Sequence, residues 1–327
     1  MLDVVALGEL LIDFTCKSVD SDGYPTMEAH PGGAPANFLA ALSRFGANTA
    51  LLGKVGDDVF GKALLRTLDG AGINTSGMII DDKVFTTLAF VTLDATGDRE
   101  FSFARKPGAD TQIRADEINY SLIDAAKVFH FGTLSLTAEP ARSATVQAVA
   151  YAKSKGKLIT YDPNLRKPLW NDLEEAKQQM LWGLQQADVV KISEEEVEFL
   201  FGMGVEDGAR HIFECYAPRL VFVTCGADGC YFLNRNASGH VPSLKDIKVV
   251  DTTGAGDIFG GSAVWMLLQT GKAPDELDME ELRHIVSFAC TSAGLSATKP
   301  GGISSVPEYN VILARLSERP IDKGEVT

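Results

Sequence analysis

The sequence has few features of a secreted, membrane-spanning or metal-chelating protein. Its five cysteines are odd in number and form no CxxC pair, so neither a disulfide framework nor a thiolate zinc site is indicated. The five histidines are isolated and none belongs to an HExxH motif, which leaves a metallohydrolase or a Ser-His hydrolase without support. No uncharged apolar run approaches the roughly 18 residues of a membrane-spanning helix. The N-terminus also lacks the basic segment of a signal peptide. We expect a cytoplasmic protein without a membrane partner.

Positive charge is also scarce. The chain has 30 Lys and Arg residues against 44 Asp and Glu, a formal net charge of −14, and nucleic-acid binding needs a basic surface. Hydrophobic residues make up 45% of the chain and charged residues 23%, which is ordinary for a globular protein with a large core and excludes a disordered one. A length of 327 residues permits two domains of about 150 residues, or one sheet with an insertion.

The hydrophobic pattern predicts an α/β fold. Short β-branched runs alternate with helical periodicity along most of the chain, as in a doubly wound, mostly parallel sheet flanked by helices. The predicted strands are 4–7, 49–52, 128–131, 158–161, 189–192, 220–224 and 231–233. The predicted helices are 35–45, 60–71, 140–155, 173–186, 194–201, 258–270 and 279–296.

Two stretches depart from this alternation. Residues 84–104 read as two β-rich runs around a turn at 95–98, which is a hairpin pattern. Residues 12–30 are extended and polar. We expect both to form a small β-sheet lid, from about 12–31 and 84–106, inserted in a single catalytic domain that spans 1–327.

The segment DTTGAGDIFGG, residues 251–261, carries the clearest chemistry. Gly254 and Gly256 leave backbone N–H groups unobstructed at the start of an apolar helix, where the helix dipole adds positive charge. This arrangement suits a phosphate or an oxyanion. Asp257, in the first turn, could accept a proton from a hydroxyl beside that phosphate. The alternative is a glycine-rich turn in which Asp257 only stabilises the helix start.

Two nucleotide-binding motifs are near matches only. Residues 254–259 share two glycines with GxGxxG, but Phe259 occupies the third glycine position and no acidic residue follows a second strand. Residues 56–63 have the GxxxxGK spacing of a P-loop, but Ala63 lacks the hydroxyl that binds Mg²⁺, and two aspartates lie in the loop. Nicotinamide and P-loop chemistry are therefore not expected.

A second junction between strand and helix suits a polyol. Gly32 and Gly33 would let a small polar ligand approach the backbone, and Asn37 offers a donor and an acceptor. Asp13, just after the first strand, belongs to the same strand-end crevice. Alternatively, the glycines make a turn and Asn37 helps to cap the helix.

These two segments, GGAPANFLAALSRFG at 32–46 and DTTGAGDIFGG at 251–261, resemble the signatures of the PfkB, or ribokinase-like, carbohydrate kinases. The likeness extends through nearly the whole chain, with further matches at GDDVFG (56–61), ATGDREFSFARKPGAD (95–110), YDPNLRKPLW (161–170), KISEEEVEFLFG (191–202) and VTCGADG (223–229). The DPNLR and FARKPGAD segments are more similar to the fructokinase branch than to ribokinase or adenosine kinase.

The resemblance implies a role for each matching position. The catalytic base would be Asp257, and the anion hole the backbone of Gly254, Ala255 and Gly256. The implied substrate contacts are Asp13, Gly32, Gly33, Asn37, Phe101, Arg105 and, near the phosphates, Arg166. The implied nucleotide contacts are Lys191, Ser193, Thr224, Gly226, Gly229, Gly254 and Gly256. A monovalent cation such as K⁺ would lie at Asp251, Thr253, Gly302 and Ser304.

One segment departs from the family pattern. The NxxE motif associated with Mg²⁺ is present here as SEEE, so Glu196 keeps the acid while Ser193 replaces the asparagine. Because Mg²⁺ is held mainly by phosphates and water, we expect dependence on Mg²⁺ to persist, with Glu196 acting through water. Glu194 and Glu195 are expected to be solvated residues of a helix start.

The sequence thus predicts an ATP-dependent kinase that phosphorylates a hydroxymethyl group of a small sugar, most consistently D-fructose. The alternatives are 2-keto-3-deoxygluconate, ribose or a nucleoside as acceptor, or a non-catalytic sugar-binding relative. A β lid with exposed edges also makes a homodimer through the lid an expectation.

Overall fold

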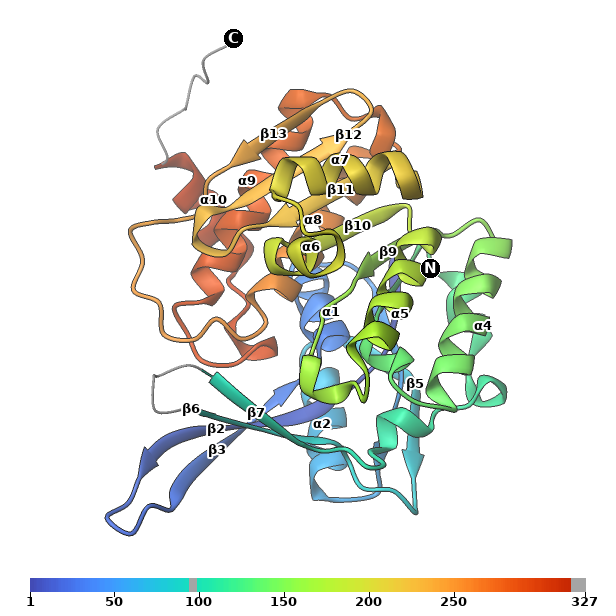
Figure 1. Cartoon of the computed structure of the whole chain (residues 1–327), viewed down its shortest axis with the longest axis vertical. Coiled ribbons are helices and arrows are strands. Elements are labelled where there is room, and N and C mark those ends of the chain that lie inside the picture. The colour runs from blue at the N-terminus through green and yellow to red at the C-terminus, as the bar shows by residue number, and fades with distance from the viewer. Residues whose placement is uncertain (94–98, 319–327) are drawn as a thin grey trace.

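The chain folds around one large sheet, and a second, smaller sheet lies beside it (Figure 1). The computed structural model describes residues 1–93 and 99–318. The large sheet has the strand order β13-β12-β11-β10-β9-β8-β1-β4-β5, parallel from β11 to β5 and antiparallel at β12 and β13. Its strands are β1 (Val4–Leu7), β4 (Thr49–Gly56), β5 (Ile73–Asp81), β8 (Val128–Gly132), β9 (Leu158–Asp162), β10 (Val189–Ser193), β11 (Leu220–Thr224), β12 (Cys230–Asn234) and β13 (Ser238–Val241).

Helices cover both faces of this sheet (Figure 1). They are α1 (Ala34–Arg44), α2 (Val59–Gly70), α3 (Tyr120–Ala125), α4 (Ala141–Ser154), α5 (Leu173–Gln186), α6 (Glu194–Phe201), α7 (Val205–Tyr216), α8 (Ala255–Thr270), α9 (Met279–Ser296) and α10 (Tyr309–Ser317). Within the described ranges, no helix combines the length and the apolar character needed to span a membrane.

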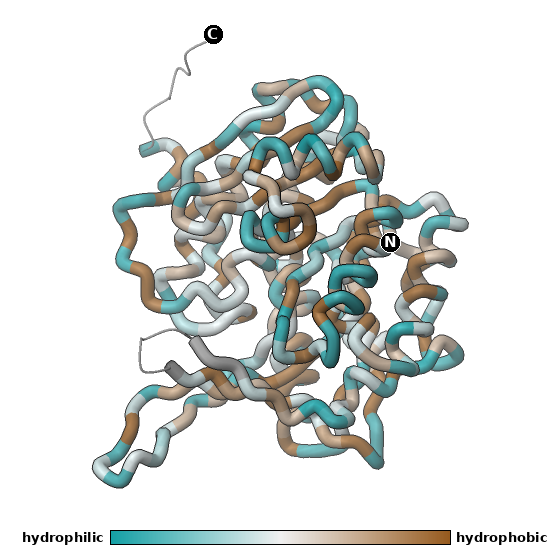
Figure 2. The backbone as a smooth tube through the Cα atoms, viewed as in Figure 1, coloured by the Kyte–Doolittle hydropathy of each residue, from teal (hydrophilic) through white to brown (hydrophobic). Residues whose placement is uncertain are grey.

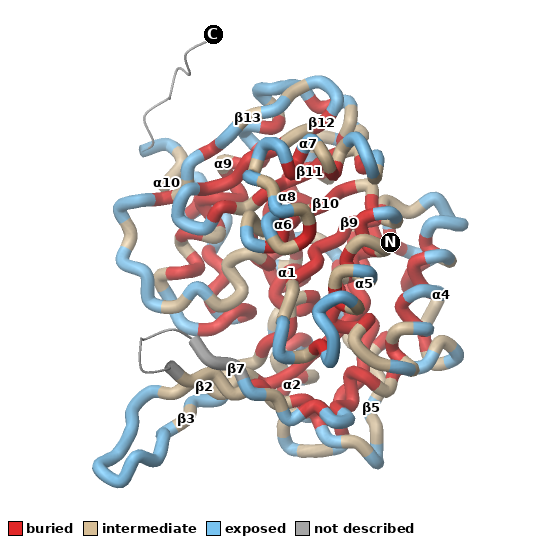
Figure 3. The backbone as a smooth tube through the Cα atoms, viewed as in Figure 1, coloured by how far each residue is buried: buried red, intermediate tan, exposed pale blue. Residues whose placement is uncertain are grey.

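Alternating side chains of the central strands enter different cores. In β1, Val5 and Leu7 belong to a cluster with α4 and α5, whereas Val4 and Ala6 belong to a cluster with α1. A third cluster joins β11 and β12 to α8 and α9. Brown and white segments therefore run through the middle of the molecule in Figure 2, and the same segments are red in Figure 3. A strand that is apolar on both faces is what a doubly covered parallel sheet requires.

The lid is a four-stranded sheet in the order β3-β2-β6-β7, made of β2 (Leu11–Val19), β3 (Pro25–Gly32), β6 (Leu88–Leu93) and β7 (Arg99–Ala104). Strand β2 pairs with β6 only from Ile12 to Thr15. Beyond that point β2 and β3 form a two-stranded ribbon that projects from the body and is exposed (Figure 3). The predicted turn at 95–98 lies outside the described residues.

The predicted fold class is confirmed, and every predicted strand and helix has a counterpart within a few residues. The prediction omitted β5, β13, α3, α7 and α10. Strand β5 is an edge strand with a glycine in its middle and several exposed residues, so it lacks the continuous apolar run of a central strand. Helix α8 begins at Ala255 rather than residue 258, and its first turn therefore contains Asp257.

Candidate active site

A pocket of about 1080 Å³ lies between the lid and the carboxyl ends of the parallel strands. Side chains from the lid line one end of it: Leu11, Asp13, Val91 and Phe103. Residues that end or follow β10, β11 and β13 line the other end, among them Ser193, Thr224, Gly226, Gly229, Ser243, Leu244, Ile247 and Val249. Gly254, Ala255, Gly256 and Asp257 also line this pocket.

Asp257 is buried, with 8% of its surface exposed. Its Oδ2 accepts a hydrogen bond from Asn37 Nδ2 (2.9 Å), and its Oδ1 accepts one from Asn164 Nδ2 (3.4 Å). Burial raises the pKa of Asp257, while the Asn37 hydrogen bond and the nearby charges of Lys191 and Arg166 lower it. Asp257 is thus a carboxylate held in place by two amides, a suitable state for a general base.

The glycines at the start of α8 have a backbone geometry that fits the predicted cradle. Gly254 has φ +75°, a left-handed conformation that favours glycine, and a Cβ there would lie 3.0 Å from Asn37 Nδ2. A Cβ on Gly256 would lie 3.0 Å from Lys191 Nζ. Ala255 is one of the three predicted anion-hole residues, and its N–H donates a hydrogen bond to Thr252 O (3.2 Å) within the protein.

Lys191 brings a positive charge to the cradle. Its Nζ forms an ion pair with Asp162 Oδ2 (3.0 Å), and both side chains are largely buried. Asp162 ends β9 and was not among the predicted site residues, although it is the aspartate of the DPNLR segment. Burial raises the pKa of Asp162, and the charge of Lys191 opposes that rise. The pair fixes an ammonium group beside Gly256, where a phosphoryl group would need it.

Glu196 joins two segments that border the pocket. Its Oε1 accepts a hydrogen bond from Leu165 N (2.6 Å), and its Oε2 accepts one from Ser193 N (2.9 Å). Ser193 Oγ accepts a hydrogen bond from Glu196 N in return (3.2 Å), a capping box at the start of α6. Serine therefore replaces asparagine at the NxxE position and retains the cap. Each carboxylate oxygen keeps a further lone pair, which fits a water-mediated contact with Mg²⁺.

Asp13 and Arg166 both line the pocket, close enough for their charges to interact. Burial raises the pKa of Asp13 to about 6, and the charge of Arg166 opposes this rise. Among the side chains that the structure describes, those of 1–92 and 102–318, none donates a hydrogen bond to the Asp13 carboxylate. Its neighbour Gly32 has no room for a Cβ because Asp13 occupies that space, and Gly33 has φ +116° against the backbone of Glu9. Asp13, Gly33, Asn37 and Arg166 all line the pocket, whereas Gly32 lies behind Asp13.

Glu9, which the sequence interpretation missed, also lines the pocket. It is 4% exposed, and its Oε1 accepts a hydrogen bond from Ala34 N (2.8 Å) at the start of α1. Burial raises its pKa to about 7. The available signal was an acid directly after the first strand and Gly8, four residues before Asp13.

Arg105 does not line the pocket. Its Nε donates to Asp110 Oδ2 (2.8 Å), its Nη1 to Thr137 Oγ1 (2.7 Å) and its Nη2 to Leu134 O (2.9 Å). The guanidinium therefore supports Leu134, which is a lining residue, from behind. Phe101 pairs with Val91 across β6 and β7, and its side chain lies outside the described part of the structure.

The nucleotide end is formed by turns and apolar side chains. Gly226 and Gly229 have φ values of +51° and +106°, which let the chain turn sharply after Thr224. Thr224, Gly226, Gly229, Lys191 and Ser193, the predicted nucleotide contacts, line this one pocket together. The apolar side chains of this end, which no motif indicated, are Leu244, Ile247, Val249, Cys290, Ala293 and Ala297.

The four predicted cation ligands lie on two adjacent loops. Asp251 Oδ1 accepts hydrogen bonds from Thr253 N (2.9 Å) and Thr253 Oγ1 (2.7 Å), and its Oδ2 accepts one from Gly301 N (3.0 Å). Ser304 Oγ lies 3.0 Å from the position of a Cβ on Gly301. Asp251, Thr253 and Ser304 carry side-chain oxygen atoms, which are suitable ligands for a monovalent cation. Gly302 is next to Gly254, with its Cα 3.0 Å from a Cβ placed there.

Residues 1–309 match the model of the pfkB family carbohydrate kinases. The chain belongs to this family. Fructokinase-1 of Zea mays is 45% identical to it over 316 residues, which cover 95% of this chain and 96% of the relative.

Solved structures of this carbohydrate kinase family are similar over nearly the whole fold. The fructokinase of Xylella fastidiosa with bound ATP has a TM-score of 0.88 and 29% identity, covering 97% of this chain and 99% of that chain. A double mutant of the Vibrio cholerae O395 fructokinase, bound to fructose, ADP and a potassium ion, has a TM-score of 0.83 and 30% identity. The match covers 96% of this chain and 98% of that chain.

Proposed function

We propose that this carbohydrate kinase is a fructokinase, which transfers the γ-phosphoryl group of ATP to a hydroxymethyl group of D-fructose. The observation that carries the proposal is the position of Asp257. The glycine cradle directly precedes it with Lys191 beside Gly256, its Oδ2 accepts a hydrogen bond from Asn37, and Asp13 lines the same pocket. The names of the similar maize, Xylella and Vibrio proteins support the choice of fructose.

In this reaction Asp257 takes the proton of the attacking hydroxyl. The hydroxyl oxygen forms a bond to the γ-phosphorus, the bond from that phosphorus to the β,γ-bridging oxygen breaks, and ADP leaves. Asn37 and Asn164 orient the carboxylate. Lys191 and the N–H groups at the start of α8 stabilise the charge on the transferred group. A lid that closes over the sugar would exclude water that would otherwise hydrolyse ATP.

Two metal ions belong to the proposal. Mg²⁺ bound to the phosphates would neutralise their charge, and Glu196 would hold one of its waters. A monovalent cation, K⁺ by chemistry, would bind the loops of Asp251 and Ser304 behind the cradle. The potassium ion in the Vibrio fructokinase structure supports this choice.

The test is a coupled assay of ADP release with ketoses, aldoses, nucleosides and 2-keto-3-deoxygluconate as acceptors. We expect D-fructose to give the highest kcat/KM, with no turnover in the absence of Mg²⁺. Preferred turnover of ribose or a nucleoside would assign the chain to another branch. If no acceptor supported ATP consumption, the proposal would be contradicted. A protein that binds fructose without consuming ATP would be a non-catalytic relative.

We also propose that the chain acts as one catalytic domain with its lid, as a homodimer in the cytoplasm. All five cysteines are free thiols, which suits a reducing compartment.

Among the described residues, the ribbon of β2 and β3 beyond Thr15 pairs with no third strand, and it exposes Val19 and Tyr24. An isolated two-stranded ribbon is marginally stable in water, so pairing with a second copy would stabilise it.

A further inference from the structure

Both carboxylate oxygens of Asp162 hold groups that the proposed reaction uses. Asp162 ends β9 and is 6% exposed. Its Oδ2 pairs with Lys191 Nζ (3.0 Å), and its Oδ1 accepts a hydrogen bond from Asn164 N (3.1 Å). Asn164 and Lys191 line the pocket, whereas Asp162 does not. Any effect of Asp162 on the reaction is therefore exerted through these two partners.

The first partner, Lys191, is placed by the pairing of β9 with β10. Tyr161 is in parallel register with Val190, so the next residue on each strand, Asp162 and Lys191, are neighbours. A Cβ on Gly256 would lie 3.0 Å from Lys191 Nζ. A lysine ammonium sits on a flexible stem, and a fixed carboxylate holds it in one position. Asp162 thus determines where positive charge lies at the start of α8.

The second partner, Asn164, has an unusual backbone conformation. Its φ is +49°, a left-handed value that costs free energy in a non-glycine residue and persists only where neighbours hold it. The hydrogen bond from Asn164 N to Asp162 Oδ1 closes the turn from within. Thr133 N donates to Pro163 O (3.3 Å) and fixes the preceding residue from outside. Asp162 is therefore one of the groups that maintain the left-handed turn.

This turn directs the Asn164 amide at the base. Asn164 Nδ2 donates to Asp257 Oδ1 (3.4 Å), whereas Asn37 Nδ2 donates to Asp257 Oδ2 (2.9 Å). The longer hydrogen bond is the weaker one, so the lone pairs of Oδ1 are less committed than those of Oδ2. Asn164 therefore limits the rotation of the carboxylate and leaves Oδ1 as the better proton acceptor.

We propose that Asp162 is a positioning residue that places the base and the phosphate-side cation relative to each other. It acts on Asp257 through Asn164 and on the transferred phosphoryl group through Lys191. This inference rests on the proposed kinase activity and deepens it, because it assigns the alignment of both groups to one buried side chain. In-line transfer needs both groups in place at once, and a misplacement of about 1 Å can cost about 10²-fold in rate.

Two substitutions separate the two contacts of Asp162. Asp162→Asn keeps an oxygen that can accept from Asn164 N and removes the charge that pairs with Lys191, whereas Asp162→Ala removes both. Asn164→Gly deletes the amide and tolerates the left-handed backbone, and Lys191→Met deletes the ammonium. The matched control is Asp188→Asn. Asp188 Oδ2 accepts a hydrogen bond from Ile159 N (2.8 Å) near the other end of β9.

We expect each variant of Asp162, Asn164 and Lys191 to lower kcat with fructose and ATP by about tenfold or more, and to change KM for fructose less. Double-mutant cycles in kcat then identify the contact that carries each effect. Asp162→Asn should add little to Lys191→Met but multiply with Asn164→Gly. Asp162→Ala should be non-additive with both, by at least about threefold. The Asp188→Asn control should keep the wild-type constants.

A merely structural role would not give this pattern. Thermal unfolding shows whether each variant is folded, and Asp162→Asn decides the question if Asp162→Ala does not fold. Wild-type kcat in Asp162→Asn would overturn the inference. It would also be overturned if the effects of Asp162→Asn and Lys191→Met multiplied, because the two side chains would then act independently.

Failure of the proposed function gives a different result. A wild type that phosphorylates no sugar would contradict the kinase assignment, and calorimetry with ATP and Mg²⁺ would then test the contact between Asp162 and Lys191. Asp162→Asn should change the affinity for ATP in the wild-type background and leave it unchanged in the Lys191→Met background. An equal change in both backgrounds, or no change in either, would contradict the inference.

Discussion

At the scale of single residues, the site is a set of buried carboxyl groups that are tolerated for different reasons. Asp257 is held by two amides, and Asp162 is paired with Lys191. Glu196 accepts two backbone N–H groups. Burial raises the pKa of each of these groups, and the partners oppose that rise. These partners decide which carboxylate remains able to accept a proton from a ligand and so to act as a base.

The role of Asp257 can be tested by replacing it with asparagine. Asp257→Asn removes the proton acceptor and keeps the size of the side chain, so we expect kcat to fall by at least about 10²-fold with a modest change in KM. Steady-state assays with fructose and ATP measure both. Asp116→Asn, at a side chain that is 72% exposed, should leave both constants unchanged. Undiminished turnover in Asp257→Asn would remove this residue from the mechanism.

Glu9 should make the stability of the protein depend on pH. Its folded-state pKa is raised to about 7 from an ordinary value of 4.5, so the folded state binds the proton more tightly than the unfolded state. Its stabilising contribution is therefore complete below pH 4.5 and is lost as the pH rises through 7. Over this pH range, the free energy of unfolding of the wild type should fall by up to about 3 kcal/mol relative to that of Glu9→Gln. Urea unfolding at pH 5 and pH 7.5 measures the difference, and a constant difference would contradict the assignment.

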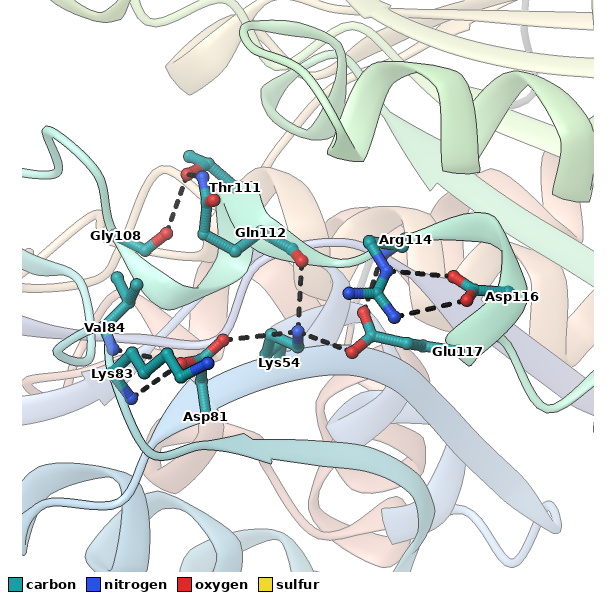
Figure 4. Close-up of polar contacts among 10 residues, drawn as sticks. All are labelled: Lys54, Asp81, Lys83, Val84, Gly108, Thr111, Gln112, Arg114, Asp116 and Glu117. Atoms are coloured by element: carbon teal, nitrogen blue, oxygen red, sulfur yellow. Dashed lines mark hydrogen bonds and ion pairs between the residues drawn. The ribbon is translucent and has the colours of Figure 1, made fainter.

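At the scale of elements, the ends of strands and helices position the site. Helix α1 begins against Glu9, and α8 begins at the left-handed Gly254. The residues before the lid strand β6 and after β7 are fixed by Asp110, which binds Thr87 and Arg105. Beside this root, Lys54 at the end of β4 joins Asp81 and Glu117 (Figure 4). The base of the lid is therefore held by the buried contacts of Asp110 as well as by apolar packing.

Removing Lys54 should destabilise the fold more than an ordinary surface change. Its Nζ lies 3.3 Å from Asp81 Oδ2 and 2.9 Å from Glu117 Oε1, and it donates to Gln112 O (3.1 Å). Lys54→Ala leaves two largely buried carboxylates unpaired, which costs about 3–5 kcal/mol. Chemical denaturation measures this loss.

The matched control for Lys54 is Lys62→Ala. Lys62 pairs with Asp57, and both side chains are more than half exposed. This exposed pair should contribute less than about 1 kcal/mol. Equal losses in the two variants would show that the Lys54 network adds nothing beyond a surface ion pair.

At the scale of the whole molecule, a chain of net charge −14 can still attract an anionic nucleotide. The attraction is local, because it comes from Lys191, Arg166 and the start of α8 at one pocket. The ribbon of β2 and β3 projects into solvent, and only its residues nearest the body line the pocket (Figure 1). Its outer part therefore does not line the pocket, which is compatible with the role in a dimer proposed above.

The proposed dimer makes this role testable. Val19 is 60% exposed and Tyr24 72% exposed on the ribbon. Introducing charge there, as in the double variant Val19→Lys, Tyr24→Lys, should shift a dimer toward monomer by repulsion across the two-fold axis. Analytical ultracentrifugation over a range of concentrations measures the shift. Val59→Lys, at a residue 68% exposed on α2, should leave the mass unchanged. A wild type that sediments as a monomer would refute the dimer.

Much of the site was predictable from short segments of sequence. Glycines that need a left-handed backbone, a helix start and an acid in its first turn are local features, so Gly254 and Asp257 could be assigned from residues 251–261 alone. Glu9 and Asp162 were missed because a single acid at a strand end has no pattern of its own. The engagement of Arg105 by Asp110, Thr137 and Leu134 could not be predicted either, because two of these partners are about thirty residues away.

The alternation of strands and helices, the family, and the prediction of Asp257 as proton acceptor all follow from the amino-acid order. The alternation depends on hydrophobic periodicity, the prediction for Asp257 on local backbone chemistry, and the family on the resemblance of short segments. Which charges neutralise one another became clear only in three dimensions. The fold pairs Lys191 with Asp162 and Arg105 with Asp110, and among the described residues it leaves Asp13 without a hydrogen-bond partner, facing the pocket. Electrostatic interactions depend on distance in space and on burial, and neither quantity is encoded at a fixed separation along the chain.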